Sequence, residues 1–291
     1  MTLAVATLAC RNASPGASSD TADRVVEPRR VDLPIGGARP VRAFRAANGT
    51  KPAPVVLVLH GYGADGSSFL EWSGLERIPE VHLVAPDGTL DSRGHRFWNA
   101  TATCCDFEGT GVDDVKYLSS LIDDVAARHP VDRTRVYAVG LSNGGAMALR
   151  LACEDRVAAV VSFAAPWNEH ACAPKSPVAV RHLHGTADTV VPYGGGPVSK
   201  GIHPNAHGTL LSATALIDGF ARRASCTGPL VEQATIDLDR AVAGEETTIA
   251  RYSDCSAPVE LWTLRGSSHV PPPLRDAFAD ETWKFLAARH R

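Results

Sequence analysis

Several features that would place this 291-residue chain in particular classes are missing from its sequence. It has no run of basic residues and no basic patch interleaved with aromatics, and its formal net charge is −3. Nothing in it therefore indicates nucleic-acid binding. No stretch approaches the ~20 consecutive apolar residues that span a bilayer. No internal repeat appears, and the length suits one large domain or two small ones.

Metal-binding patterns are also missing, although the chain has seven cysteines. No C-x-x-C pair occurs, and no cysteines and histidines have the spacing of a zinc site, so we expect no metal. This number of cysteines is typical of an exported protein with disulfide bonds, and an odd count leaves one cysteine over. The seven are Cys10, Cys104, Cys105, Cys153, Cys172, Cys226 and Cys255.

The cysteine left over is expected to be Cys10. Residues 1–10 are short and apolar with small residues before the cysteine, and the polar stretch that follows to Ala22 is typical of a disordered tether. The pair resembles the end of a bacterial lipoprotein signal peptide and its linker, although no basic segment precedes it. The alternative is a frayed terminus with an unpaired thiol. Residues 1–30 are thus interpreted as leader and linker, and residues 31–291 as the folded domain. We expect the protein in the cell envelope or outside the cell. If Cys10 is modified, a lipid anchors the protein to the membrane.

Apolar runs alternate with helical patterns along the folded domain. After two short extended runs within residues 31–46, the runs expected to be buried strands are residues 54–60, 81–85, 135–139, 157–165, 178–184 and 260–264. The segments with helical periodicity are residues 113–129, 144–152, 212–224 and 274–288. This alternation predicts a mostly parallel, doubly wound sheet with helices on both faces. Too few residues separate Phe163 from Val178 for a large helical lid, although residues 192–209 could cover a site.

The most informative motif is Gly140-Leu141-Ser142-Asn143-Gly144, directly after an apolar run. In a strand–turn–helix context, G-x-S-x-G forms a turn so tight that bulkier flanking side chains would clash, and it leaves the serine hydroxyl exposed above the sheet. The start of a helix also favours developing negative charge. The alternative is a glycine-rich turn before a buried helix, because the pentapeptide alone is common.

A serine nucleophile needs a base and an acid to orient that base, and on this fold they follow in the order acid, then histidine. Asp188 comes directly after one predicted strand, and His269 directly after the last. Alone, Asp188 could be a turn cap and His269 a solvated loop residue; their order and placement favour a triad. The rivals are Asp218, expected within a helix, the pair His203 and His207, His290 in the terminal tail, and His182 with His184, which share a strand face beside the acid loop.

An oxyanion hole requires two backbone N–H donors. Asn143 follows the nucleophile and supplies one. The second is expected from the loop His60-Gly61-Tyr62-Gly63, with Tyr62 favoured over Gly61 and Gly63. The alternative for this segment is a plain turn at the end of a strand.

With these residues in place, the chain from about Val31 onward resembles the polyhydroxybutyrate depolymerase-like esterases, which are related to feruloyl and acetylxylan esterases. The matching stretches are Leu59-His60-Gly61-Tyr62-Gly63, Pro86-Asp87-Gly88-Thr89, Phe97-Trp98-Asn99-Ala100, Cys104-Cys105-Asp106, Val112-Asp113-Asp114-Val115, Gly140-Leu141-Ser142-Asn143-Gly144-Gly145, Leu151-Ala152-Cys153, His184-Gly185-Thr186-Ala187-Asp188 and Leu261-Trp262. The resemblance implies an α/β-hydrolase fold and a Ser142–His269–Asp188 triad acting on carboxylic esters. The chain departs from the family at Ser267 and Ser268, where glycines usually precede the histidine.

The family resemblance also implies a Cys226–Cys255 disulfide. Cys104 and Cys105 are then expected to bond to Cys153 and Cys172 in an order left open, since adjacent cysteines seldom bond to each other.

We therefore expect a monomeric serine esterase that needs no cofactor and acts on an ester substrate, polymeric if the site is open. The residues expected around the substrate are His60, Tyr62, Trp98, Trp167 and Tyr193, with a buried core position as the alternative for Trp98. Two other functions remain open: a serine peptidase on the same fold, and a catalytically silent envelope lipoprotein that binds polymer or cell wall. The acyl group could be a short polyhydroxyalkanoate, a feruloyl or acetyl group on polysaccharide, or that of a small ester.

Overall fold

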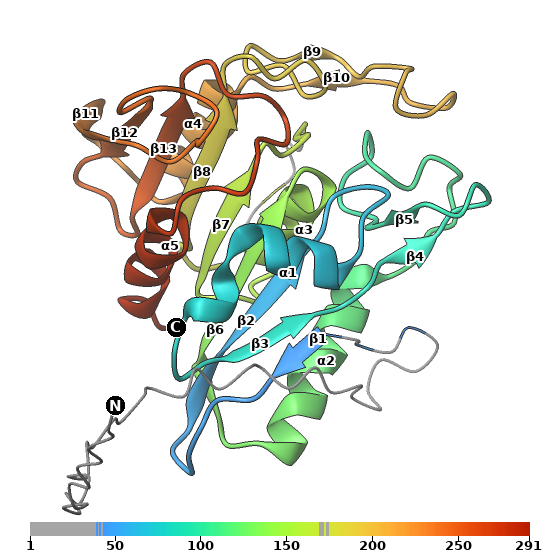
Figure 1. Ribbon diagram of the computed structural model, residues 1–291, viewed down its shortest axis with the longest axis vertical. Coiled ribbons are helices and arrows are strands. Elements are labelled where there is room, and N and C mark those ends of the chain that lie inside the picture. Colours follow the sequence, from blue (N-terminus) through green and yellow to red (C-terminus); the bar gives the residue numbers. More distant parts are fainter. Residues whose placement is uncertain (1–38, 40, 42, 169–171, 173–174) are drawn as a thin grey trace, which may run out of the picture.

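The computed structural model describes residues 39, 41, 43–168, 172 and 175–291 (Figure 1). The predicted leader, linker and Cys10 lie outside the described residues. No helix within the described part of the chain is both long enough and apolar enough to cross a bilayer.

A twisted nine-stranded sheet runs through the centre of the molecule in the order β1-β3-β2-β6-β7-β8-β13-β12-β11 (Figure 1). The strands are β1 (Ala43–Arg45), β2 (Ala53–Leu59), β3 (His82–Ala85), β6 (Val131–Leu141), β7 (Ala159–Phe163), β8 (Ala179–Gly185), β11 (Leu230–Ile236), β12 (Thr247–Tyr252) and β13 (Val259–Leu264). The six strands from β3 to β13 pair in parallel, and β1, β12 and β11 are antiparallel to their neighbours. The predicted mostly parallel, doubly wound sheet is confirmed.

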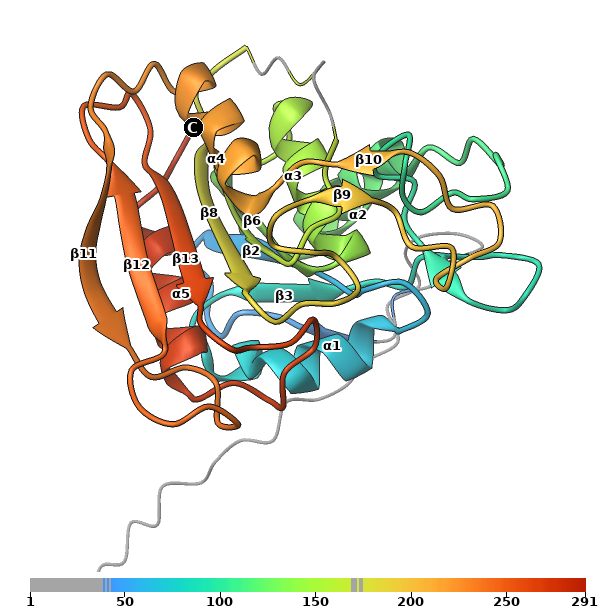
Figure 2. The same cartoon turned by 90° about the horizontal axis from the view of Figure 1, so that it is seen from above.

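Helices cover both faces of this sheet (Figure 2). They are α1 (Gly66–Ser73), α2 (Asp114–Arg128), α3 (Asn143–Cys153), α4 (Ala213–Arg223) and α5 (Ala277–Ala287), with a short 3₁₀ turn at Leu75–Arg77. Apolar residues of α2, α3 and α4 form one core with Val55 and Leu57 of β2, whereas α1 and α5 form the second core with Val56 and Val58. Because successive strand residues point to opposite faces, one continuous apolar strand serves both cores.

Three elements of the central sheet and its covering helices were not expected from the sequence. Helix α1 is short, and its start depends on a capping box in which Asp65 accepts from the Ser68 N–H. Strands β11 and β12 extend the sheet antiparallel beyond β13. Strand β11 is exposed for most of its length, so it carries no apolar run by which it could be recognised.

Two excursions rise at the carboxyl edge of the sheet, and neither contains an α-helix. The first includes the hairpin of β4 (Thr89–Leu90) and β5 (Arg96–Phe97), and the second is a ribbon of β9 (Gly196–Pro197) and β10 (Thr209–Leu210), seen from above in Figure 2. They touch where Asn205 Nδ2 donates to the Phe107 carbonyl (3.2 Å) and the rings of Phe107 and His203 stack.

The disulfides differ in part from expectation. Cys226 bonds to Cys255, but Cys153 bonds to Cys172 and Cys104 to its neighbour Cys105. The predicted pairing of Cys104 and Cys105 with Cys153 and Cys172 is therefore wrong.

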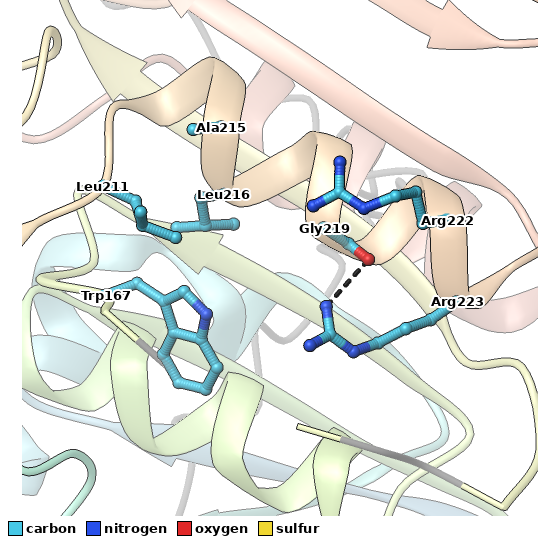
Figure 3. A pocket seen from close by; sticks show the side chains of 7 residues that line it. All are labelled: Trp167, Leu211, Ala215, Leu216, Gly219, Arg222 and Arg223. Carbon is cyan, nitrogen blue, oxygen red and sulfur yellow. Dashed lines mark hydrogen bonds between the residues drawn. The ribbon is translucent and has the colours of Figure 1, made fainter. Parts of the chain in front are cut away.

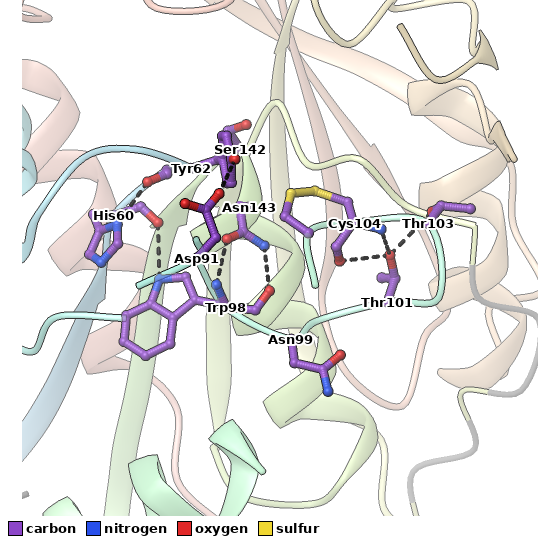
Figure 4. The surroundings of a disulfide bond; sticks show 12 residues. His60, Tyr62, Asp91, Trp98, Asn99, Thr101, Thr103, Cys104, Ser142 and Asn143 are labelled. Carbon is purple, nitrogen blue, oxygen red and sulfur yellow. Dashed lines mark hydrogen bonds between the residues drawn. A yellow bond between two sulfur atoms is a disulfide. The ribbon is translucent and has the colours of Figure 1, made fainter. Parts of the chain in front are cut away.

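The length of α3 explains this correction. The loop with Cys104 is held near the first turn of α3, because the side chain of Asn143 bonds the backbone of Trp98 (Figure 4). Cys153 ends the same helix, which is 11 residues or about 16 Å long. A disulfide spans only about 4.4–6.8 Å between Cα atoms, so Cys153 reaches Cys172, at 5.0 Å, instead.

The packing of α3 on the sheet predicts a strong effect of one added methyl group. A Cβ at Gly144 would lie 2.0 Å from the Leu59 carbonyl oxygen, which is backbone and cannot swing away. We expect Gly144→Ala to lower the free energy of unfolding in urea by about 3 kcal/mol or more. Gly194→Ala is the control, because nothing lies within 4 Å of its added Cβ. Equal stability of the two variants would contradict this packing.

Candidate active site

Ser142 occupies a strained turn between β6 and α3. Its backbone has φ 53° and ψ −119°, a conformation that few residues other than glycine adopt. A Cβ at Gly140 would lie 2.1 Å from the Gly144 carbonyl oxygen. Both motif glycines are therefore required by close contacts, as the sequence predicted, and the serine between them lies at the N-terminus of α3.

Two loops bring the predicted acid and histidine to this serine. His269 Nδ1 lies 2.6 Å from Asp188 Oδ2, and its Nε2 lies 2.9 Å from Ser142 Oγ. Asp188 follows β8 and His269 follows β13, which pair in parallel, so both loops leave the same edge of the sheet. The Ala187 N–H also donates to the Ser267 carbonyl at 3.0 Å, which joins the loops directly.

The carboxyl of Asp188 is arranged to stay ionised. Burial alone would raise its pKa, but hydrogen bonds from His184 and His269, the nearby His269 charge and the Val191 N–H together hold that pKa well below its usual range. Oδ1 accepts from the N–H groups of Val190 and Val191, each at 2.8 Å. A carboxylate here requires the proton of His269 on Nδ1, which leaves Nε2 as the acceptor facing the serine hydroxyl.

The predicted oxyanion residues lie beside Ser142. A Cβ at Gly61 would lie 3.5 Å from the Ser142 Cβ, so the loop after β2 faces the nucleophile. The Gly63 N–H already donates to the Arg96 carbonyl at 2.8 Å, which leaves Gly61 and Tyr62 as candidates. Within the described part of the chain, the N–H groups of Tyr62 and Asn143 donate to no backbone carbonyl.

Two residues expected around the substrate support this loop. Trp98 and His60 are both fully buried. Trp98 Nε1 donates to the His60 carbonyl at 3.1 Å (Figure 4). His60 Nε2 accepts the Gly88 N–H at 2.9 Å. Burial lowers the pKa of His60 and favours its neutral form. This burial agrees with the core alternative for Trp98, and a substrate contact of His60 or Trp98 stays a prediction.

Asn143 has a structural role that the motif did not reveal. Its buried side chain accepts from the Trp98 N–H at 2.7 Å and donates to the Trp98 carbonyl at 2.8 Å. These two bonds tie the start of α3 to the loop that carries Trp98. The sequence signal for this role was the amide side chain of Asn143. The second x of G-x-S-x-G can be any residue as far as the turn is concerned, so an amide there indicates a further contact.

Trp167 and Tyr193 have other partners within the fold. Trp167 is buried beneath α4 and lines a cavity of about 330 Å³ with Leu211, Ala215, Leu216, Gly219, Arg222 and Arg223 (Figure 3). None of the three residues at the serine site lines it. The Tyr193 hydroxyl pairs with the Thr263 hydroxyl at 2.9 Å, and its ring packs on His184. Tyr193 therefore packs against the strand and loop that carry the acid, and substrate contacts of Trp167 and Tyr193 stay predictions.

Ser267, which stands before His269 where the family usually has glycine, has a hydrogen-bond partner. The buried hydroxyl of Ser267 donates to the buried carboxylate of Asp239. This bond anchors the histidine loop to the segment between β11 and β12, where a glycine would supply no side chain. Of the rival residues, Asp218 lies on α4 and accepts from the Tyr252 hydroxyl, so it is engaged elsewhere.

One group of side chains has the atom types of a cation site. Ligand atoms of Asp91, Glu108 and His203 lie within 4.8 Å of one another. Each already has a partner: Asp91 accepts from the Tyr62 hydroxyl, Glu108 from the Ser92 N–H, and His203 Nδ1 from the Asn205 N–H. We assign no ion to this group, and the expected lack of a metal stays a prediction.

The depressed pKa of Asp188 predicts a specific pH dependence of stability. A carboxyl with a lowered folded-state pKa stabilises the fold above its unfolded pKa of about 3.9, and this contribution is lost as pH falls. We expect the wild type to exceed Asp188→Asn in unfolding free energy by a constant amount above about pH 5 and by less below about pH 4. Urea unfolding at a series of pH values measures this. A difference that stays constant down to pH 3 would contradict the assignment.

Comparisons with known proteins agree with this architecture. The family model described as phospholipase/carboxylesterase matches residues 43–210, more than half of the chain. Feruloyl esterase B of Piromyces equi is 28% identical over 236 residues, 76% of this chain but 40% of that protein, so the chain spans less than half its length. Feruloyl esterase C of Emericella nidulans is 26% identical over 256 residues, 82% of this chain and 79% of the other.

Solved structures show the same fold. An acetyl xylan esterase from Aspergillus awamori matches with a TM-score of 0.57 at 10% identity, covering 90% of this chain and 98% of that one. The expected α/β-hydrolase fold and esterase resemblance are thus confirmed. The chain belongs to the phospholipase/carboxylesterase family and is a carboxylic ester hydrolase.

Proposed function

We propose that this carboxylic ester hydrolase works through an acyl-enzyme on Ser142. The observation that carries the proposal is the continuous pair of hydrogen bonds from Ser142 Oγ to His269 Nε2 and from His269 Nδ1 to Asp188. Nucleophile, base and orienting acid are thus in contact without any rearrangement.

The chemistry follows from this geometry. Nε2 of His269 accepts the hydroxyl proton as Ser142 Oγ attacks the ester carbonyl carbon. The same nitrogen then protonates the departing alcohol, and an acyl group remains on the serine. Water, deprotonated by His269, attacks the acyl carbonyl and releases the acid. Asp188 keeps the proton of the imidazole on Nδ1 and stabilises the imidazolium formed in each step.

The developing oxyanion is assigned to the backbone N–H groups of Asn143 and Tyr62. Both belong to segments that the structure holds firmly: Asn143 through Trp98, and the Tyr62 loop through His60 and the Gly63–Arg96 bond. Preorganised donors need no reorientation as the charge develops, and one such donor typically supplies ~3 kcal/mol of transition-state stabilisation.

For the substrate, we propose acyl groups esterified to a polysaccharide, feruloyl or acetyl, acted on outside the cytoplasm. The names of the feruloyl and acetyl xylan esterase relatives support the acyl groups. The two described excursions at the site carry no lid helix, which leaves room for a bulky alcohol. Three disulfides support export, because such bonds persist in oxidising compartments. The monomeric state, a lipid on Cys10 and a polymeric substrate remain proposals.

Removing the nucleophile provides the first test. We expect Ser142→Ala to lower kcat for p-nitrophenyl acetate by at least about 1,000-fold, since the oxyanion hole and binding alone leave little catalysis. A fluorophosphonate probe should label the wild type on the peptide that contains Ser142. Ser119→Ala, on the outer part of α2, is the control and should keep wild-type activity. Full hydrolysis by folded Ser142→Ala would overturn the proposal, and a folded wild type that takes no label would favour a catalytically silent binding protein.

The oxyanion assignment makes a second, separate prediction. Tyr62→Phe keeps the backbone N–H and removes only the hydroxyl that binds Asp91. We therefore expect kcat for p-nitrophenyl acetate within about threefold of the wild type, whereas loss of a true oxyanion donor costs roughly 100- to 1,000-fold. A 100-fold fall for Tyr62→Phe, in a variant of unchanged melting temperature, would show that the phenol rather than the N–H is the donor.

Substrate class is tested with three panels. Methyl ferulate and feruloylated arabinoxylan, acetylated xylan, and short polyhydroxybutyrate oligomers are each incubated with enzyme, and the released acids are identified by mass spectrometry. We expect the polysaccharide esters to give the highest kcat/KM. Preference for polyhydroxybutyrate would refute this substrate class while leaving the esterase intact, and dipeptide cleavage outpacing every ester would support a peptidase.

A further inference from the structure

A buried line of three polar side chains lies behind the acid of the serine site. Ser162 is on β7, and His182 and His184 are on β8; all three are at most 1% exposed. Ser162 Oγ is 3.3 Å from His182 Nδ1, and His182 Nε2 is 3.1 Å from His184 Nδ1. His184 Nε2 then faces the carbonyl oxygen of Val191 at 2.8 Å and Asp188 Oδ2 at 3.4 Å.

The last contact fixes where a proton must lie. A carbonyl oxygen and a carboxylate oxygen can only accept, so His184 Nε2 carries a hydrogen, which it donates to the Val191 carbonyl with Asp188 Oδ2 beside it at 3.4 Å. Burial, then the neighbouring His184, holds the pKa of His182 well below its ordinary value, so this ring is neutral. If His184 carries a single proton, on Nε2, its Nδ1 accepts from His182 Nε2, and Ser162 donates to His182 Nδ1. Every hydrogen in the line then points towards Asp188.

The ring of His184 is also enclosed on its other sides. The ring of Tyr193 packs edge-on against it, with centroids 5.5 Å apart, and the Tyr193 hydroxyl is held by Thr263. Val191 accepts from His184 and donates its own N–H to Asp188 Oδ1 at 2.8 Å. The His184 imidazole is therefore linked to Asp188 through Val191 as well as lying next to it.

We propose that His184 is a positioning residue for the proposed ester hydrolysis, holding Asp188 in place through a second N–H on the oxygen that accepts from His269. Ser162 and His182 act through it by fixing its tautomer and orientation. The proposal rests on the proposed triad. Ser142 and His269 touch the reacting atoms, whereas His184 touches the acid, its loop and His182.

Two consequences follow if Asp188 Oδ2 is shared between two N–H donors. Without His184, the carboxylate loses one of the contacts that orient it, so His269 is held less well and kcat falls. The freed oxygen also interacts more strongly with the imidazolium and so favours the protonated ring. The acidic limb of the kcat/KM profile should therefore move to higher pH, a change that loss of packing alone does not produce.

The experiment compares His184→Phe and His184→Gln with a matched control, His82→Phe. His82 is 1% exposed on β3, accepts the Ala47 N–H and contacts the Pro130 carbonyl, so its loss removes similar buried bonds away from the serine site. With p-nitrophenyl acetate, we expect His184→Phe to lose on the order of 100-fold in kcat, the scale of a small misplacement of catalytic groups, with KM within twofold. The acidic limb of its kcat/KM profile should move to higher pH. His82→Phe should keep the kcat and the acidic limb of the wild type.

His184→Gln and one double variant keep the test decisive. His184→Gln retains an amide donor and should recover part of the lost kcat; it replaces His184→Phe if that variant does not fold. In the double variant His182→Phe/His184→Phe, kcat should fall no further than in His184→Phe alone, because His182 acts through His184.

The inference is overturned if the folded His184 variants keep wild-type kcat and an unmoved acidic limb, or if His82→Phe loses as much activity. That result is distinct from failure of the proposed function. If Ser142→Ala is inactive and the wild type takes the fluorophosphonate label while the His184 variants match the wild type, only the positioning role is refuted. If Ser142→Ala retains activity, the triad itself is wrong.

Discussion

The site depends on one tight turn, in which the chain leaves the end of β6 and enters α3 within a single residue. Ser142 takes a left-handed backbone conformation there, and the neighbouring backbone comes so close at Gly140 and Gly144 that no side chain fits. This turn places the hydroxyl beyond the sheet and at the helix N-terminus. The strain is balanced by packing on both faces of the sheet, so the core and the nucleophile depend on each other.

The partners of Ser142 reach it because of strand order. Strands β8 and β13 are parallel neighbours, and their carboxyl ends release the Asp188 and His269 loops at one edge. Hydrogen bonds then hold each loop: the His184 ring and the Val191 backbone on the acid side, and Asp239 through Ser267 on the histidine side. The oxyanion loop is fixed in the same way by Trp98 and His60. Buried polar groups therefore surround the reacting atoms and limit their freedom.

Local signals sufficed for the parallel strands, the four longer helices and the candidates Ser142, Asp188 and His269, because each follows an apolar run or a helix signature that needs no distant partner. Contacts between distant segments could not be read this way. Strand β11 belongs to the sheet only through pairing with β12, and the choice of Cys172 for Cys153 depends on the length of α3. Aromatic residues near the motifs suggested substrate contacts, but the structure uses Trp98 and Trp167 for packing.

The central claim is that a covalent acyl group passes through Ser142. The most direct test is rapid-quench intact-mass analysis of the enzyme during p-nitrophenyl acetate turnover, followed by peptide mapping. The account predicts a transient species heavier by one acetyl group, located on the peptide that contains Ser142, that forms as nitrophenol is released and decays as acetate appears. Turnover by the wild type with no acylated species, or an acetyl group on another residue, would contradict it.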